Sequence, residues 1–411
     1  MSKTKDKLYF WDFVLLWCGA AISIAEILTG GSIVAVGFKK GLIAIILGHL
    51  IGTAIFIFAG IIGTRENIPA ITSTRISFGL YGTYLFSILN VLQLLGWTAV
   101  MINTCAQSLN LISKTMWSIN NIPLWSVLTA VLIILVIALG MTGFKKINTL
   151  AVVLLFALTL VLGWVVFRSG KLFSQPSGGS MSFGSALELV IAMPLSWLPM
   201  VADYTRFAEN EKEGAFGSFL GYFVGSSWMF VIGLGAAIVS KNPDPSAMML
   251  AANLGISAFG IVVLSTVTTT FMDAYSAGVT FLNIIPKFNE KAAAVVITII
   301  GMVVSLLVNM DNYTNFLYAI GSVFAPLFAV LLTDYFIIKK QTKIEDKLLL
   351  NIGATIVWAI GVATYYLFIK LDFIFGATLP SMIITGILYF VSWRYINKWK
   401  LMKNSKNSYA A

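Results

Sequence analysis

Residues 19–37 read GAAISIAEILTGGSIVAVG, and residues 188–207 read ELVIAMPLSWLPMVADYTRF. Both stretches are apolar enough to cross a bilayer, yet each carries helix-breaking residues in its middle. The first has adjacent glycines close to the acidic Glu26, and the second has Pro194 and Pro199 five residues apart. Proline removes a backbone donor, and carbonyls freed in lipid need other partners. We therefore expect two interrupted membrane helices that line a cavity.

The rest of the chain is equally apolar. Of its 411 residues 58% are hydrophobic and 11% are charged, whereas soluble domains carry ~25% charged residues. The excess apolar surface indicates an all-α polytopic membrane protein in a lipid bilayer. Successive apolar runs predict twelve spans, at 13–37, 41–63, 83–111, 123–142, 147–167, 186–207, 217–239, 259–283, 292–310, 313–338, 348–369 and 376–396.

The net charge of +10 is an orientation signal rather than a nucleic-acid patch. With the N-terminus inside, 20 of the 27 Lys and Arg residues fall on the cytoplasmic side and seven on the other. Cytoplasmic loops of membrane proteins are enriched in these residues. We therefore expect both termini in the cytoplasm of a plasma-membrane protein, with no nucleic-acid partner.

The two interrupted spans are the first and the sixth, and they enter the membrane from opposite sides. This pattern is typical of two inverted five-helix repeats with a binding site at their interface. We expect one transporter domain over 1–411, with repeat one at about 13–167, repeat two at about 186–338, and two extra helices at about 348–396.

Glu26 is the most informative single residue of the first span. A carboxylate at the middle of a membrane costs ~2.5–3.5 kcal/mol by the lower scales, so it needs a cation, a donor-rich ligand or a proton. The alternative is a structural hydrogen bond to unwound backbone. The pattern favours a functional carboxyl group in the cavity.

Span eight carries a polar face. Thr266, Thr269, Thr270 and Asp273 recur at helical spacing. Their oxygens are hard ligands that suit Na⁺ or a polar solute. Alternatively, the threonine hydroxyls bond back to carbonyls of their own helix.

Span three contributes Gln93, Trp97 and Met101 at four-residue spacing. The flat face of Trp97 would suit a planar ring, and Trp197 would form the opposite wall with Ser196 beside it to bond a ring edge. The alternative for each tryptophan is ordinary packing within the helix bundle.

Other functional classes find little support. Cys18, Cys105 and His49 provide no His/Cys metal cluster, and no CxxC motif is present. The absence of GxxxxGK[ST], HExxH and GxSxG motifs argues against an ATP pump or a membrane hydrolase. A channel would need a continuous polar lining. The intramembrane charges instead gather near the two broken helices, which favours a carrier over a channel or an enzyme.

Four segments together resemble the nucleobase:cation symporter-1 family, which includes cytosine permease and the hydantoin and allantoin carriers. The resemblance covers about residues 8–396, and Glu26 together with the span-six segment is most similar to the CytX-type transporters of hydroxymethylpyrimidine, the thiamine precursor. The segments are FWDFVLLWCGAAISIAEILTGG, STRISFGLYGTYLFSILNVLQLLGW, PLSWLPMVADYTRF and APLFAVLLTDYF.

The resemblance implies the leucine-transporter-like fold, with two inverted five-helix repeats plus two C-terminal helices. It places the solute between spans one, three, six and eight, and it implies that Glu26, Trp97, Ser196 and Trp197 contact the solute. The amide of relatives in span eight falls near Thr270, where this chain has no Asn. Met101 and Asp273 complete the predicted contact set.

The resemblance also implies a cation site between spans one and eight. Its ligands would be the carbonyls of Ile22 and Ala25 and the hydroxyls of Ser265 and Thr266. Na⁺ is the expected coupling ion, with H⁺ as the alternative.

The expected function is cation-coupled uptake of a small pyrimidine-type solute by alternating access. Glu26 would accept amine protons from the amidine-like edge of hydroxymethylpyrimidine. The alternative solutes are cytosine and other purine, pyrimidine or hydantoin compounds. The sequence leaves the oligomeric state open.

Overall fold

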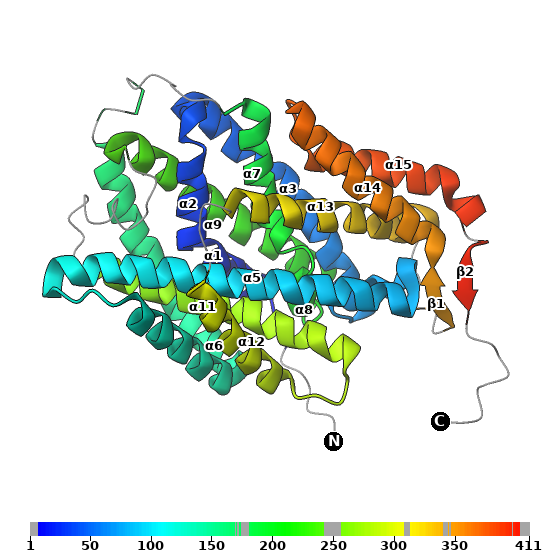
Figure 1. Ribbon diagram of the computed structural model, residues 1–411, viewed down its shortest axis with the longest axis horizontal. Helices are drawn as coiled ribbons and strands as arrows, with labels where there is room; N and C mark the ends of the chain where they lie inside the picture. Colours follow the sequence, from blue (N-terminus) through cyan, green and yellow to red (C-terminus); the bar gives the residue numbers. More distant parts are fainter. Residues whose placement is uncertain are drawn as a thin grey trace.

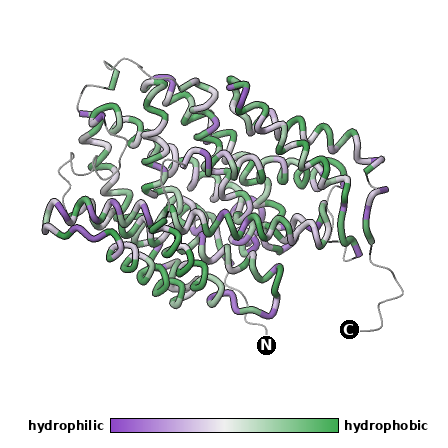
Figure 2. The backbone as a smooth tube through the Cα atoms, in the orientation of Figure 1, coloured by the Kyte–Doolittle hydropathy of each residue, from purple (hydrophilic) through white to green (hydrophobic). Residues whose placement is uncertain are grey.

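The computed structural model describes residues 7–168, 170, 172–173, 181–241, 256–307, 313–339, 344, 347–396 and 398–402. Most of them are helical, and Figure 1 shows the long helices packed side by side. Hydrophobic residues run along most of the helical length (Figure 2). Large apolar side chains such as Leu150 and Val391 are 63% and 67% exposed. Contiguous apolar surface of this kind is what a lipid-facing protein presents.

The long helices follow the predicted apolar runs, with two internal turns. α5 and α6 each turn at a glycine of positive φ, Gly79 and Gly140, where a residue with a Cβ is disfavoured. The turn at Gly140 separates the fourth and fifth predicted spans. The long helices are α3 (Phe38–Glu66), α5 (Arg75–Trp117), α6 (Ile122–Phe167), α9 (Glu211–Ser240), α11 (Ile256–Ile284), α12 (Glu290–Ser305), α13 (Tyr313–Leu332), α14 (Ile352–Leu371) and α15 (Thr378–Ile396).

Within the described residues, nine helical segments are long and apolar enough to cross a membrane, and one bent pair of helices would make a tenth. Neither α11 nor the sixteen-residue α12 is among them. The multi-pass helical architecture is thus confirmed, whereas the count of twelve spans stays a prediction.

The first predicted span is broken, as expected. It consists of α1 (Phe10–Ala21) and α2 (Ile24–Ser32), which are bent by 58° relative to each other. At the break, Ser23 is the N-cap of α2, and its hydroxyl accepts the backbone N–H of Glu26 at 3.4 Å. Glu26 therefore lies in the first turn of a short helix that starts inside the protein.

The sixth predicted span is broken as well, into α7 (Phe183–Ser196) and α8 (Val201–Thr205). Carbonyls near the break find partners on α5. The Gln93 amide donates to the Ser196 carbonyl at 2.9 Å, and the Asn90 amide donates to the Pro199 carbonyl at 3.5 Å. Side chains of a neighbouring helix thus replace the bonds that the interruption removes.

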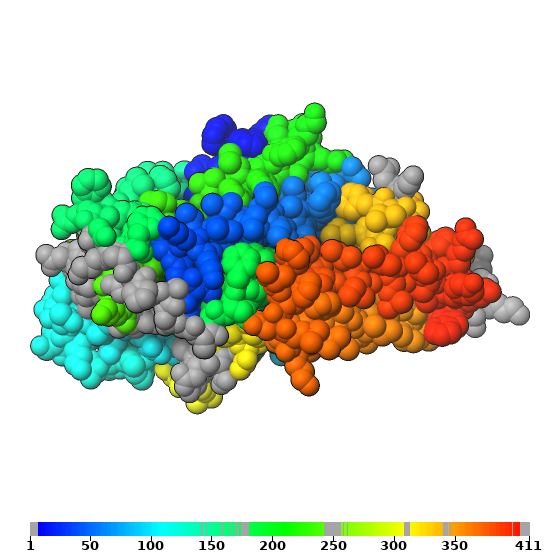
Figure 3. All heavy atoms as spheres, turned by 90° about the horizontal axis from the view of Figure 1, so that it is seen from above, coloured from blue at the N-terminus to red at the C-terminus, as the bar shows by residue number. Residues whose placement is uncertain are grey.

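The helices form two groups. One group contains α1, α2, α3, α7, α8 and α9, and the other contains α5, α6, α11 and α12. The broken helices α1/α2 and α7/α8 both belong to the first group, and they meet α5 and α11 of the second. α14 and α15 pack on α13 and form one end of the molecule, orange to red in Figure 3.

Helices α2 and α9 approach each other through glycines. A Cβ on Gly233 would lie 2.1 Å from the Ile27 carbonyl oxygen, and one on Gly30 would lie 2.4 Å from the Phe230 carbonyl oxygen. Small residues let membrane helices pack backbone to backbone in this way. The second half of the first span is therefore held tightly against α9.

A buried carboxylate joins α7 to the C-terminal helices. Glu188 accepts hydrogen bonds from the Tyr365 hydroxyl at 2.7 Å and from the backbone and side chain of Thr378 at 2.8 and 2.7 Å. The Ala377 N–H adds a fourth bond at 2.7 Å. This carboxylate, which the sequence analysis did not single out, caps the start of α15.

One predicted boundary is wrong. The span expected at 348–369 opens with β1 (Leu348–Asn351), which pairs antiparallel with β2 (Lys400–Met402), and α14 starts only at Ile352. The Asn351 side chain accepts the Ala354 N–H and so fixes the start of α14. The remaining short elements are η1 (Val34–Val36), α4 (Ala70–Ser73) and η3 (Thr333–Lys339).

Candidate functional site

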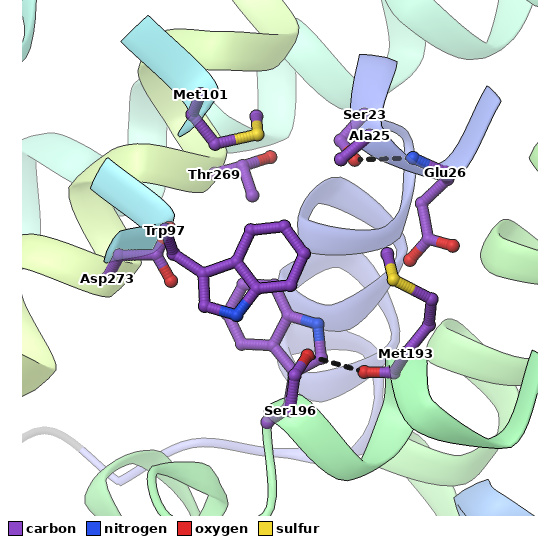
Figure 4. A pocket seen from close by; sticks show the side chains of 10 residues that line it. Ser23, Ala25, Glu26, Trp97, Met101, Met193, Ser196, Thr269 and Asp273 are labelled. Atoms are coloured by element: carbon purple, nitrogen blue, oxygen red, sulfur yellow. Dashed lines mark hydrogen bonds between the residues drawn. The ribbon is translucent and has the colours of Figure 1, made fainter. Parts of the chain in front are cut away.

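A pocket lies where the two broken spans meet α5 and α11 (Figure 4). Of the seven side chains predicted to contact the solute, six line it, and Thr270 does not. The six are Glu26, Trp97, Met101, Ser196, Trp197 and Asp273. Ser23, Ala25, Met193 and Thr269 complete the described lining.

Two indole rings from opposite helix groups border the pocket. Trp97 of α5 and Trp197, at the end of α7, are each 6% exposed. Trp97 makes an edge contact with Phe316 at a centroid distance of 5.4 Å, and Trp197 makes one with Trp17 at 5.5 Å. These contacts fix the rings, and the Trp97 Nε1 has no hydrogen-bond partner among the described residues. The pocket thus offers aromatic surface and an unused donor.

Glu26 is buried, and both of its carboxylate oxygens have partners. The Tyr222 hydroxyl donates to Oε1 at 2.7 Å, and the Ser226 hydroxyl donates to Oε2 at 2.8 Å. Tyr222 and Ser226 lie one turn apart on α9, and Ser226 also contacts Nε2 of His49. The carboxyl group therefore fastens the first turn of α2 to α9, although its side chain still lines the pocket.

Asp273 of α11 lies across the pocket from Glu26, beside Trp97 (Figure 4). Its side chain is 3% exposed. No hydrogen bond or ion pair reaches its carboxyl group from the described residues, unlike that of Glu26. A buried carboxyl group without partners is costly, so the site is incomplete without a ligand or a proton on this group.

The residues predicted to bind a cation are only partly free to do so. The Ala25 carbonyl accepts the Thr29 hydroxyl at 2.7 Å, and the Ser265 hydroxyl donates to the Val262 carbonyl at 3.2 Å. The Thr266 hydroxyl is fully buried, and the Cys105 thiol is a polar neighbour of it. Ile22 lies at the break between α1 and α2.

Two threonines of the polar face of α11 differ in their surroundings. The Thr269 hydroxyl is in the pocket and donates to the Ala20 carbonyl of α1 at 3.4 Å. The Thr270 hydroxyl is buried outside the pocket lining, and no described group bonds to it. The two hydroxyls, which the helical spacing placed on one face, therefore lie in different environments, one in the pocket and one outside it.

Sequence reasoning missed three residues around the site. Tyr222 and Ser226 lie in a Gly-rich apolar helix, and His49 was considered only as a possible metal ligand. The four-residue spacing of Tyr222 and Ser226 indicates that their hydroxyls share one face of α9. Nothing in the sequence pairs them with Glu26, which lies 196 and 200 residues earlier.

The chain matches a family model over residues 2–391, nearly its whole length. The model is described as a permease for cytosine/purines, uracil, thiamine and allantoin. The cytosine permease of Escherichia coli strain K12 is 25% identical over 390 residues, which cover 92% of this chain and 90% of that protein. The allantoin permease of Bacillus subtilis strain 168 is 24% identical over 397 residues, covering 84% and 79% of the two chains.

Solved structures agree on the fold. Mhp1, a nucleobase-cation-symport-1 family transporter in a closed conformation with bromovinylhydantoin bound, superposes with a TM-score of 0.85 at 18% identity. The match covers 97% of this chain and 95% of Mhp1. A Na⁺-coupled sialic acid symporter gives a TM-score of 0.71 at 12% identity, covering 97% and 92%. The expected leucine-transporter-like fold is thereby confirmed.

The broken helices, the pocket between them and the family match lead to the same result. The chain belongs to the permease family for cytosine/purines, uracil, thiamine and allantoin, and it is a multi-pass membrane transport protein rather than an enzyme.

Proposed function

We propose that this protein takes up a small pyrimidine-type solute across the plasma membrane by cation-coupled alternating access, with hydroxymethylpyrimidine as the solute. The observation that carries the proposal is the pocket at the two broken spans, bordered by Trp97 and Trp197. Two aromatic faces suit a planar ring, and offset or edge contacts with such rings add about 0.5–1.5 kcal/mol each.

The choice of hydroxymethylpyrimidine rests on the CytX-type segments AISIAEILTGG and PLSWLPMVADYTR. Cytosine, or another purine, pyrimidine or hydantoin compound, is the second candidate. It is favoured by the similarity to the cytosine and allantoin permeases and to the hydantoin permease of Microbacterium maritypicum. The hydantoin permease is 20% identical over 414 residues, and the match covers 92% of this chain and 83% of that protein.

The proposed transport cycle uses the two helix groups. The solute binds between them, because Trp197 and Glu26 come from one group while Trp97 and Asp273 come from the other. Rocking of one group against the other would expose the pocket first outside and then to the cytoplasm. In this scheme residues about 13–167 and 186–338 are the inverted repeats, and both termini are cytoplasmic.

Na⁺ is the proposed coupling ion, with H⁺ as the alternative. Carbonyls at the interrupted first span and the buried Thr266 hydroxyl are hard oxygen ligands of the kind that Na⁺ takes. Ile22, Ala25, Ser265 and Thr266 would hold the ion next to the solute. Uptake measured with Na⁺ replaced at fixed pH separates the two ions, because only a Na⁺-coupled carrier loses transport.

The solute is tested by thermal unfolding of purified protein with hydroxymethylpyrimidine, thiamine, cytosine, uracil and hydantoins. A ligand that binds the folded state raises the melting temperature. We expect the largest increase with hydroxymethylpyrimidine. If none of the compounds changes the melting temperature and none is taken up by cells, the proposal is wrong.

The aromatic walls are tested with Trp97→Ala. Loss of the stacking face should raise the apparent KM for uptake by about tenfold or more, which corresponds to ~1.4 kcal/mol of binding. Trp117→Ala is the matched control, because Trp117 lies on the same helix and is 46% exposed outside the pocket. Equal KM values for the two variants would remove Trp97 from the site.

A further inference from the structure

We propose that Asp273, rather than Glu26, is the carboxyl group that recognises the solute, and that the solute presents a ring nitrogen next to an exocyclic amino group. This inference rests on the proposed function, because it concerns the ligand of the same pocket. It assigns the two buried carboxyl groups different roles, one in binding and one in holding the framework together.

Glu26 already has the partners that a recognition group would seek in its ligand. Tyr222 and Ser226 donate to its two oxygens at 2.7 and 2.8 Å, and both donors come from α9. Since α9 packs backbone to backbone against α2 through Gly233 and Gly30, these donors cannot move away readily. The bonded oxygens are thus held on the α9 side of the residue.

Asp273 has the opposite surroundings. It is 3% exposed, it lines the pocket, and no described residue bonds to its carboxyl group. No Lys, Arg or His is among the described lining residues, so no protein cation compensates it. The other acidic lining group, Glu26, lies across the pocket, and when it is ionised it would repel a negative charge on Asp273 (Figure 4). What satisfies Asp273 must therefore come from outside the described protein, as a proton, a cation or a donor of the ligand, and the donor is what a solute in this pocket supplies.

An amidine-type edge fits this requirement in either protonation state. A neutral carboxyl group offers one donor and one acceptor, which match the ring nitrogen and the amino N–H. An ionised carboxylate offers two acceptors, which match the two N–H groups of the protonated ring. In both cases two parallel hydrogen bonds form and the pair shares one proton, as in bidentate carboxylate recognition.

An oxo ring satisfies Asp273 less well. Its carbonyl and neighbouring N–H match only the neutral carboxyl group, because an ionised carboxylate would face the carbonyl oxygen with its own lone pairs. The oxo ring also has no basic ring nitrogen at this edge, so it cannot accept the proton of the carboxyl group. A pocket built around an unpartnered carboxyl group should consequently prefer the amino compound over the oxo compound of the same shape.

The experiment compares matched ring pairs on the purified full-length protein. Cytosine and uracil differ in an amino group replaced by an oxo group, and hydroxymethylpyrimidine is paired in the same way with its oxo analogue. Calorimetric or thermal-shift affinities are measured for the wild type and for Asp273→Asn and Glu26→Gln. The wild type should prefer each amino compound by at least about tenfold, because charge-assisted pairs are roughly twice as strong as neutral ones.

The two variants should differ in their preference for amino over oxo rings. The side chain in Asp273→Asn offers an NH₂ donor and a carbonyl acceptor but cannot ionise, so it should bind amino and oxo rings within about threefold of each other. Glu26→Gln should keep the amino preference, whatever it does to absolute affinity. Retention of the preference in Asp273→Asn, or its loss in Glu26→Gln, would overturn the assignment.

Two further outcomes separate this inference from the proposed function. If the wild type binds amino and oxo rings equally, only the role of Asp273 is wrong. If it binds no ring at all, the proposed function fails and this inference fails with it. Asp273→Ala, checked for an unchanged melting temperature without ligand, serves as a second variant, and it should also lose the preference.

Discussion

The two sides of the pocket are built differently. On the α2–α9 side, glycines bring the backbones into contact, and the buried carboxylate of Glu26 has a hydroxyl donor on each oxygen. On the α5–α11 side, the Trp97 Nε1 has no partner within the described chain, and no hydrogen bond from a described residue reaches the Asp273 carboxyl group. Buried polar groups are normally satisfied, so the fully bonded carboxylate of Glu26 indicates framework and the unbonded carboxyl group of Asp273 indicates where something else binds.

The contrast follows the two helix groups. Glu26, Tyr222 and Ser226 belong to the group that contains both broken spans, and their bonds tie that group together. Asp273 and Trp97 belong to the other group, and the described residues leave the Asp273 carboxyl group and the Trp97 Nε1 without partners. Both features suit a carrier that works by alternating access. A group of helices that is held together by its own bonds can rock as a unit, and open polar groups on the facing helices leave contacts for the solute to make.

The largest effect on stability is expected for Gly233→Val. A Cβ at this position would lie 2.1 Å from the Ile27 carbonyl oxygen, so α9 would have to move away from α2. We expect the free energy of unfolding to fall by about 3 kcal/mol or more, read from the melting temperature in detergent. Gly260→Val is the control, because nothing described lies within 4 Å of a Cβ there. Equal melting temperatures for the two variants would contradict a tight α2–α9 contact.

A smaller loss is expected for Glu26→Ala. Removing the carboxylate leaves the Tyr222 and Ser226 hydroxyls without their buried acceptor, which should cost about 2–3 kcal/mol of unfolding free energy. Glu26→Gln keeps one amide oxygen as an acceptor and should lose less than half as much. Thermal unfolding of the two variants side by side measures the difference. A Glu26→Ala protein as stable as the wild type would mean that the saturated side does not depend on this carboxylate.

The smallest effect on stability is expected for Asp273→Ala, together with a large effect on transport. The carboxyl group makes no described hydrogen bond, so its loss should change the unfolding free energy by no more than about 0.5 kcal/mol, or raise it. Uptake should nevertheless fall at least about tenfold, because a charge-assisted contact with the solute is gone. A melting temperature as low as that of Glu26→Ala would erase the difference between the two sides.

Much of the architecture could be predicted from local sequence. Apolar runs located the membrane helices, and Pro194, Pro199 and the glycines near Glu26 located the two breaks. These features act over a few residues, since hydropathy and backbone breaking are properties of short windows. The helical spacing of Gln93, Trp97 and Met101 predicted a shared face, of which Trp97 and Met101 reach the pocket while Gln93 bonds to the Ser196 carbonyl beside it.

The sequence by itself predicted that two carboxyl groups, at Glu26 and Asp273, would be buried within the protein, because apolar residues surround both along the chain. Only the tertiary structure decided which of them is already satisfied. The donors to Glu26 come from residues 196 and 200 positions away, whereas no described residue supplies such a donor to Asp273 on α11. Burial follows from neighbours in sequence, but hydrogen-bond satisfaction depends on which helices pack together.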